Sequence, residues 1–89
     1  MPSASAFSFS PLYSNVEPSG TKDGVNPTFT LPNSHKYVVG TLMVFLNGQM
    51  YQPISIDQTD VTRTTFTIVS DNLPTSLDVL HITYLRSLS

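Results

Sequence analysis

Cysteine is absent from this chain of 89 residues, and charged residues are few. Without thiols the protein can form neither a disulfide framework nor a thiolate metal site, and nothing in it indicates an oxidising compartment. Charged residues make up 11% of the sequence, against roughly 25% in ordinary soluble domains. The net charge is -2, and the basic residues are the scattered Lys22, Lys36, Arg63 and Arg86. They form no basic stripe that could follow a phosphate backbone, so we expect no nucleic-acid partner.

The sequence also lacks a long hydrophobic run. The longest, Leu42 to Leu46, stops at Asn47-Gly48 and is far shorter than the roughly 20 residues that cross a bilayer. The opening stretch MPSASAFSFS has no positively charged segment and no continuous apolar core, which argues against a signal peptide. We therefore expect a soluble chain with no membrane partner.

Catalytic constellations are missing as well. An enzyme needs a nucleophile beside a base, paired carboxylates or a metal cluster, and His35 and His81 lie in no such motif. Asp57 and Asp60 resemble a pair of calcium ligands, but the spacing lacks the further ligands and the glycine of a calcium loop. Aspartates that hydrogen-bond their own backbone in a turn are the simpler interpretation. We predict no enzymatic activity, no metal and no cofactor.

The clearest local feature that is present is the stretch TLMVFLNGQMYQP, Thr41 to Pro53. Asn47-Gly48 predicts a two-residue hairpin, because Asn and Gly adopt at little cost the positive φ that such a turn requires. One face of the preceding strand carries Leu42, Val44 and Leu46, and the other carries Met43 and Phe45. Two apolar faces indicate a strand that is buried between two layers or that also contacts another chain.

From residue 26 onward the pattern is that of short β-strands. The segments expected to form them are residues 28–31, 41–46, 49–56, 63–69 and 79–86, with a bend or bulge at Pro53. No window shows a 3.6-residue period, so we predict no helix beyond a single turn near Ser34 or Leu73. The fold class is predicted to be all-β, a small antiparallel β-sandwich or open barrel of five to six short strands.

The core of such a domain is small. It is predicted to contain Phe29, Leu42, Val44, Leu46, Tyr51, Ile56, Phe66, Ile68, Leu80 and Ile82. Small domains without disulfides or a metal usually gain the missing stability by association. Apolar residues remain on second faces and suit an interface: Met43, Phe45, Val69 and Val79.

The first 25 residues differ in composition from the rest. Their prolines, glycines and serines do not favour a packed core, so we interpret residues 1–25 as an extended docking arm and residues 26–89 as the β-sandwich domain. The arm carries more apolar side chains than a solvated linker requires, namely Phe7, Phe9, Leu12, Tyr13 and Val16. These suggest docking on a neighbour. The alternative is that the segment packs back on its own domain.

Two long stretches, FTLPNSHKYVVGTLMVFLNGQMYQP and TTFTIVSDNLPTSLDVLHITYL, together resemble a small β module of tailed-bacteriophage virion proteins, found in tail fibres, necks and baseplates. Residues 44–48 match its vFlNG hairpin and residues 65–67 its itf strand. Its closing D.l.i.Y strand is matched by Asp78, Leu80, Ile82 and Tyr84. The resemblance covers about residues 28 to 86. It departs from the family after the hairpin, where PISIDQTD replaces the usual g.dYt and leaves the path of the middle strand open.

The resemblance implies a structural protein of the virion, assembled in the host cytoplasm with other virion proteins and with copies of itself. It would be an oligomeric tail, neck or baseplate adaptor or a fibre component. The alternative is a capsid decoration or a module that binds a host receptor or glycan, for which Tyr13, Tyr37, Tyr51 and Tyr84 could supply a platform. The predicted subunit interface contains Phe7, Phe9, Leu12, Tyr13, Met43, Phe45, Met50 and Tyr51, with Asn47 and Gly48 as the hairpin turn that frames it.

Overall fold

The computed structural model describes residues 11–88. These residues form eight strands: β1 (Leu12–Val16), β2 (Thr28–Thr30), β3 (Lys36–Tyr37), β4 (Met43–Leu46), β5 (Gln49–Met50), β6 (Ile56–Asp57), β7 (Thr65–Ile68) and β8 (Leu80–Ser87). Two short 3-10 helices, η2 (Pro32–Ser34) and η3 (Pro53–Ser55), interrupt them, and the described part of the chain contains no α-helix. The single turn expected near Ser34 is present as η2, whereas no helix forms near Leu73.

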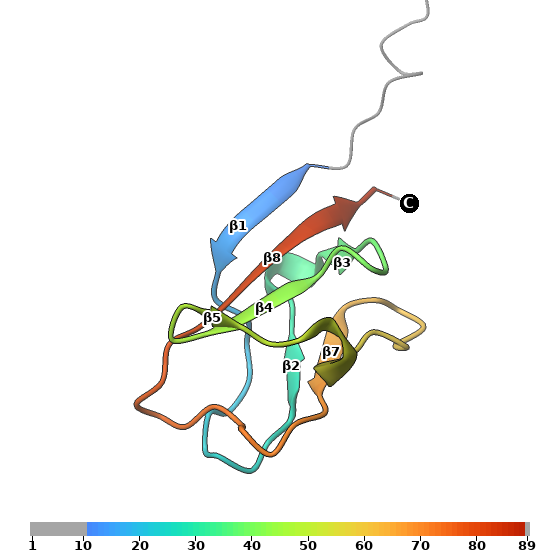
Figure 1. Cartoon of the computed structure of the whole chain (residues 1–89). Helices are drawn as coiled ribbons and strands as arrows, with labels where there is room; N and C mark the ends of the chain where they lie inside the picture. The colour runs from blue at the N-terminus through green and yellow to red at the C-terminus, as the bar shows by residue number, and fades with distance from the viewer. Residues whose placement is uncertain (1–10, 89) are drawn as a thin grey trace, which may run out of the picture.

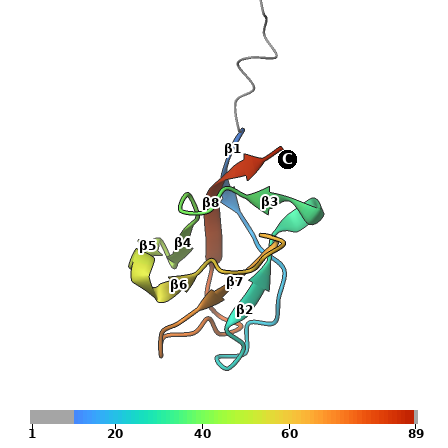
Figure 2. The ribbon, with the colours of Figure 1, turned by 90° about the vertical axis from the view of Figure 1, so that its right-hand side faces the viewer.

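The strands form two antiparallel sheets, and the protein is a small all-β sandwich, as the sequence predicts (Figure 1). One sheet has the order β1-β8-β4-β5, with β3 also paired to β8, and the other has the order β2-β7-β6. Turned by 90°, the ribbon has β4 and β5 on one side and β2 on the other, with β7 between them (Figure 2). The longest strand, β8, pairs with β1, β3 and β4 and so organises the larger sheet.

The core lies between the two sheets. Its buried hydrophobic residues are Phe29, Leu31, Tyr37, Leu42, Val44, Leu46, Ile56, Phe66, Ile68, Leu80, Ile82 and Tyr84. Every predicted core residue except Tyr51, which is partly buried, belongs to this set. The period of two explains the agreement: alternate residues of β4, β7 and β8 are buried, so each strand directs one face inward.

The hairpin at Asn47-Gly48 is confirmed. Asn47 has φ 52° and Gly48 has φ 85°, as a two-residue turn between right-twisted strands requires. The partners Leu46 and Gln49 close it. The interruption expected at Pro53 is present, and it is larger than a bend or bulge: β5 ends at Met50, η3 begins at Pro53, and β6 begins at Ile56. Proline fixes its own φ and lacks an N–H, so the chain turns there and leaves the larger sheet for β6.

Residues 11–25 differ from the extended arm expected for residues 1–25. Residues 12–16 form β1, and Tyr13 and Val16 pack against the core. Farther along, Ser19 and Thr30 exchange two backbone hydrogen bonds of 2.8 Å. Gly20 passes so close to Phe29 that a Cβ would lie 2.5 Å from the ring. The described part of this segment therefore packs on the sandwich, because each of these contacts satisfies a backbone group or buries an apolar side chain.

Candidate assembly surface

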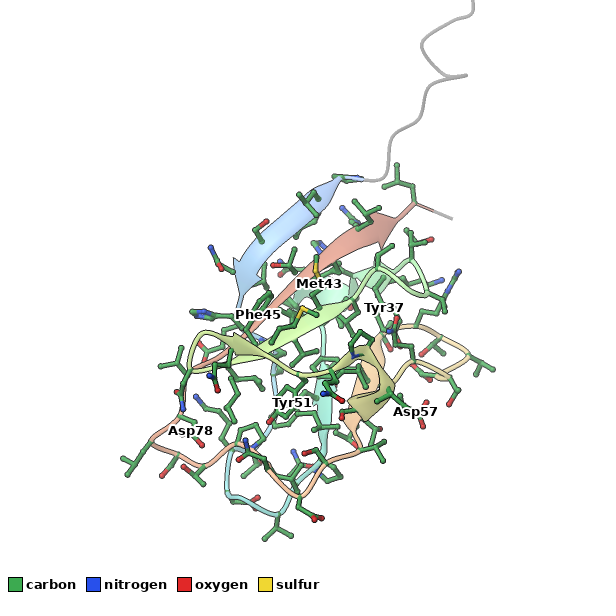
Figure 3. The ribbon with its side chains drawn as sticks, in the orientation of Figure 1. Tyr37, Met43, Phe45, Tyr51, Asp57 and Asp78 are labelled. Atoms are coloured by element: carbon green, nitrogen blue, oxygen red, sulfur yellow. The ribbon has the colours of Figure 1, made fainter. Side chains whose placement is uncertain are left out.

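The face of the larger sheet that points away from the core carries a group of apolar side chains. Residues directly opposite each other in an antiparallel pair project to the same side. Phe45 is opposite both Met50 and His81, Met43 is opposite Thr83, and Leu12 is opposite Leu85. We call this set the outer apolar face: Leu12, Met43, Phe45, Met50, His81, Thr83 and Leu85. Figure 3 shows Met43 and Phe45 next to each other along β4.

The outer apolar face is accessible in the isolated chain. Leu12 is 62% exposed, Met50 is 46% exposed and Met43 is 38% exposed, while Phe45 and Leu85 are half-buried. The other exposed large hydrophobic residues of the described chain are Val25, Val39, Ile54, Val61, Val69, Leu77, Val79 and Leu88, all outside the strands. Single apolar residues on loops are ordinary, whereas a contiguous apolar sheet face indicates a surface that is covered in use.

No charged residue is a member of the outer apolar face, but Lys36 borders it: on β3 it is opposite Ser87, which projects to the same side of the sheet as Leu85. The ten charged residues of the chain are Glu17, Lys22, Asp23, Lys36, Asp57, Asp60, Arg63, Asp71, Asp78 and Arg86. Of these, only Arg86 belongs to β1, β4, β5 or β8. Arg86 is opposite the buried Tyr37 and follows Leu85 in the strand, so it projects to the other side of the sheet from Leu85. A face without charge can be buried with no cost for desolvating an ion.

The structure brings together four of the eight predicted interface residues, Leu12, Met43, Phe45 and Met50. Tyr13 and Tyr51 instead point inward. The Tyr13 ring stacks on Tyr84 with centroids 5.5 Å apart, and the Tyr51 hydroxyl donates to the Asn72 carbonyl. Phe7 and Phe9 lie outside the described residues.

Sequence reasoning missed Leu85 and Thr83 as members of the face. In the sequence, attention to β8 was limited to the residues that face the core, Leu80, Ile82 and Tyr84. The alternation of that strand was the available signal, because residues between inward-facing neighbours project outward. Leu85 then continues the apolar row begun by Leu12 on β1.

The turn between β4 and β5 is fixed to the loop before β8. The Asn47 side-chain amide donates to an Asp78 carboxylate oxygen at 2.9 Å, and its oxygen accepts from the Val79 backbone N–H at 2.8 Å. Asp78 also accepts from the Thr75 N–H at 2.8 Å. These hydrogen bonds, that from Asn47 first, hold the pKa of Asp78 below its ordinary value. The hairpin that carries Phe45 and Met50 is therefore anchored at its tip.

A buried polar cluster holds β1 against the sheet. His35 is 8% exposed, and its Nδ1 shares a hydrogen bond of 2.8 Å with the Tyr84 hydroxyl. The Tyr13 ring lies 4.8 Å from the His35 ring. Burial, and secondarily the charge of Arg86, lowers the pKa of His35 below its ordinary value. The neutral imidazole of His35 is thus the form favoured in the folded chain. Through its contact with Tyr13 it helps to hold β1, the strand that also carries Leu12.

The aspartates considered as calcium ligands are engaged by their own loop. The Asp60 carboxylate accepts from the Thr62 hydroxyl at 2.7 Å and from the Thr64 and Thr65 N–H groups at 3.1 Å. The Thr62 bond is the largest cause that places the pKa of Asp60 well below its usual range. Asp57 accepts from the hydroxyl and the N–H of Thr59. Among residues 11–88 no group of three or more possible metal ligands occurs.

Neither a pocket nor a membrane-spanning element is found in the part of the chain that the structure describes. No cavity is detected there. None of its helices has the length and apolar character that crossing a bilayer requires. The sheet face is therefore the feature of the described surface that argues most directly for a contact with another molecule.

Comparisons with protein-family models, with curated proteins and with solved structures found no match to this chain.

Proposed function

We propose that the chain is a structural protein of a tailed-bacteriophage virion, an oligomeric tail, neck or baseplate adaptor or a fibre component. The observation that supports this proposal is the outer apolar face: an accessible, uncharged sheet surface on a domain with a small core. An antiparallel sheet normally presents one polar face to water. Here both faces of β4 are apolar, and among residues 11–88 only the inner face is fully covered.

The resemblance to the virion module supports the same proposal. Its three matched elements lie on β4 with its turn, on β7, and on β8 with the preceding Asp78. Two of the three, β4 and β8, form the centre of the sheet that carries the outer apolar face. The elements matched to the module thus include the strands that form the surface and the two residues, Asn47 and Asp78, whose hydrogen bond holds the hairpin.

The glycan-binding alternative has no specific support among residues 11–88. Of the four tyrosines proposed for a platform, Tyr37 and Tyr84 are fully buried. Tyr13 stacks inward on Tyr84, and the Tyr51 hydroxyl is engaged by Asn72. An exposed aromatic platform therefore does not form from them, and the structural role is the one we propose.

The first test is incorporation into particles. We expect the chain in purified virions of the phage that encodes it, and we expect a Met43→Glu, Phe45→Glu double variant to be lost from them, because each new carboxylate would have to be buried unpaired. The matched control is Val61→Glu with Leu77→Glu, since both residues are 92% exposed and lie on loops. Absence of the wild-type chain from particles would refute the proposal. Equal incorporation of both variants would show that the outer apolar face is not the surface that holds the chain in the particle.

A further inference from the structure

We propose that the outer apolar face packs against the same face of a second copy of this chain. The inference rests on the proposed function only for its biological setting, since it concerns which partner covers the face. It can be tested on the isolated protein.

The charge distribution favours a second copy as the partner. None of the ten charged residues is a member of the face, and the one that borders it, Lys36 on β3, is opposite Ser87 at the end of β8. Two copies that pack over Met43 and Phe45 therefore bury no unpaired ion. A partner that relied on a charged patch would find nothing on this face to pair with. Because the net charge of each chain is only -2, long-range repulsion between copies is also small.

The geometry of the face is compatible with a twofold arrangement. The apolar side chains run obliquely across the sheet, from Leu12 and Leu85 at one corner, past Met43, to Phe45 and Met50 at the other. A twofold axis in the plane of the interface, along or across this row, superposes the row of one copy on that of the other. Two apolar sheet faces then pack about 10 Å apart, as the two layers of a sandwich do.

The size of the face predicts a weak dimer. Four strands at a spacing of about 4.8 Å and about five residues at roughly 3.3 Å each give a plane of about 19 by 17 Å, or roughly 320 Å². Side chains raise the accessible area above that plane, but it stays below the approximately 800 Å² per partner of a standard stable interface. We therefore expect reversible, concentration-dependent association rather than an obligate dimer.

The absence of cysteine allows a direct test. Thr83 lies on the outer face of β8, the central strand, opposite Met43. A Thr83→Cys variant of the full chain, treated at rising concentration with a short bis-maleimide reagent, is expected to give a covalent dimer. Thr67→Cys, on the outer face of β7 in the other sheet, is the matched control and is expected to remain a monomer. Adding Met43→Glu to Thr83→Cys should abolish the dimer.

A second variant separates the partner proposed here from the first ten residues of the chain. The Thr83→Cys chain with Phe7→Ser and Phe9→Ser should dimerise as the parent does if the faces contact each other. Loss of the dimer in that variant would show that this segment, and not packing of face on face, joins the two copies. Absence of any dimer of the parent, or equal cross-linking through Thr67→Cys, would equally overturn the inference. These outcomes are independent of incorporation into particles, because a monomeric chain can still occupy a virion and a dimeric one can be absent from it.

Discussion

The outward-facing sides of the two sheets differ in composition, although their inward-facing sides build one core. The smaller sheet presents Thr28 opposite Thr67 and Thr30 opposite Thr65, and its edge strand adds Asp57. The larger sheet presents Phe45 opposite Met50 and Met43 opposite Thr83. Threonine has the β-branched shape that strands favour and a hydroxyl that water can solvate. The side chains of methionine and phenylalanine have no group that water solvates well, so their exposure on a sheet face is unfavourable.

The comparison shows that the outward-facing side of the smaller sheet is polar enough to be solvated, whereas that of the larger sheet is not. The hydroxyls of Thr28 and Thr67 lie 3.2 Å apart and hydrogen-bond across the strands. Strand β7 therefore alternates strictly between core and polar side chains, whereas β4 is apolar on both sides. The difference lies in the sequence rather than in the fold, since both strands are antiparallel and have one buried face. It is the difference expected if a partner covers the larger sheet, as proposed above.

The largest effect is expected where the two regions are joined. Phe66 on β7 is 1% exposed, and its ring packs on Phe29 with centroids 6.1 Å apart. Phe66→Ala should lower the free energy of unfolding by about 3–5 kcal/mol, because it leaves a cavity between the sheets. Phe45→Ala, on the outer apolar face, should cost less than about 1 kcal/mol in dilute solution. Urea unfolding followed by circular dichroism measures both. Equal losses would show that the outer face is as buried as the core and would end the comparison.

A smaller effect, from one titrating side chain, is expected with pH. His35 has a lowered pKa in the folded state, so below its ordinary value of about 6.5 the unfolded chain binds more protons than the folded one. The contribution of His35 to stability is therefore complete above about pH 6.5 and decreases as the pH falls below that value. The thermal midpoint of the wild type should be lower at pH 5.5 than at pH 7.5.

Substitution assigns that pH effect to one of the two histidines. His35→Gln should flatten the decrease in the thermal midpoint between pH 7.5 and pH 5.5. His81→Gln, on the outer apolar face, should leave it in place. A decrease that survives His35→Gln unchanged would mean that the cluster of His35, Tyr84 and Tyr13 does not hold β1 in the way its geometry indicates.

Local patterns predicted the centre of the fold, and long-range pairing supplied what they missed. Asn47-Gly48 and the period of two placed β4, β7, β8 and nearly the whole core. Strand β1 has the sequence LYSNV, in which Tyr13 and Val16 pack inward, and its partner β8 lies far along the chain. Nothing local distinguishes such a segment from a linker, because its stability comes from contacts that a sequence window does not contain.

The candidate surface was predicted in part for the same reason. Met43 and Phe45 follow from alternation next to a recognisable turn. Tyr13 was predicted to be at the interface as part of the docking arm, and Tyr51 as part of the hairpin. A tyrosine can also bury its ring while its hydroxyl finds a partner, and only the three-dimensional arrangement shows that Tyr51 does so through Asn72. The alternation of β8 places Leu85 on the outer side, but its contact with Leu12 depends on the register between β1 and β8.

The smallest effect on stability, and the sharpest use of the comparison, is expected from exchanging the two faces. Phe45 and Met50 are directly opposite each other, and so are Thr67 and Thr28. The variant Phe45→Thr, Met50→Thr, Thr67→Phe, Thr28→Met keeps each pair on an outer face and changes only which sheet is apolar. Because no core residue is altered, its free energy of unfolding should stay within about 1 kcal/mol of the wild type. Cross-linking should move with the apolar pair: a cysteine at position 83 should no longer give a dimer, and one at position 30, on β2, should begin to. If association stayed on the larger sheet after the exchange, the apolar pair would not be its cause, and strand pairing at the sheet edge would be the better explanation.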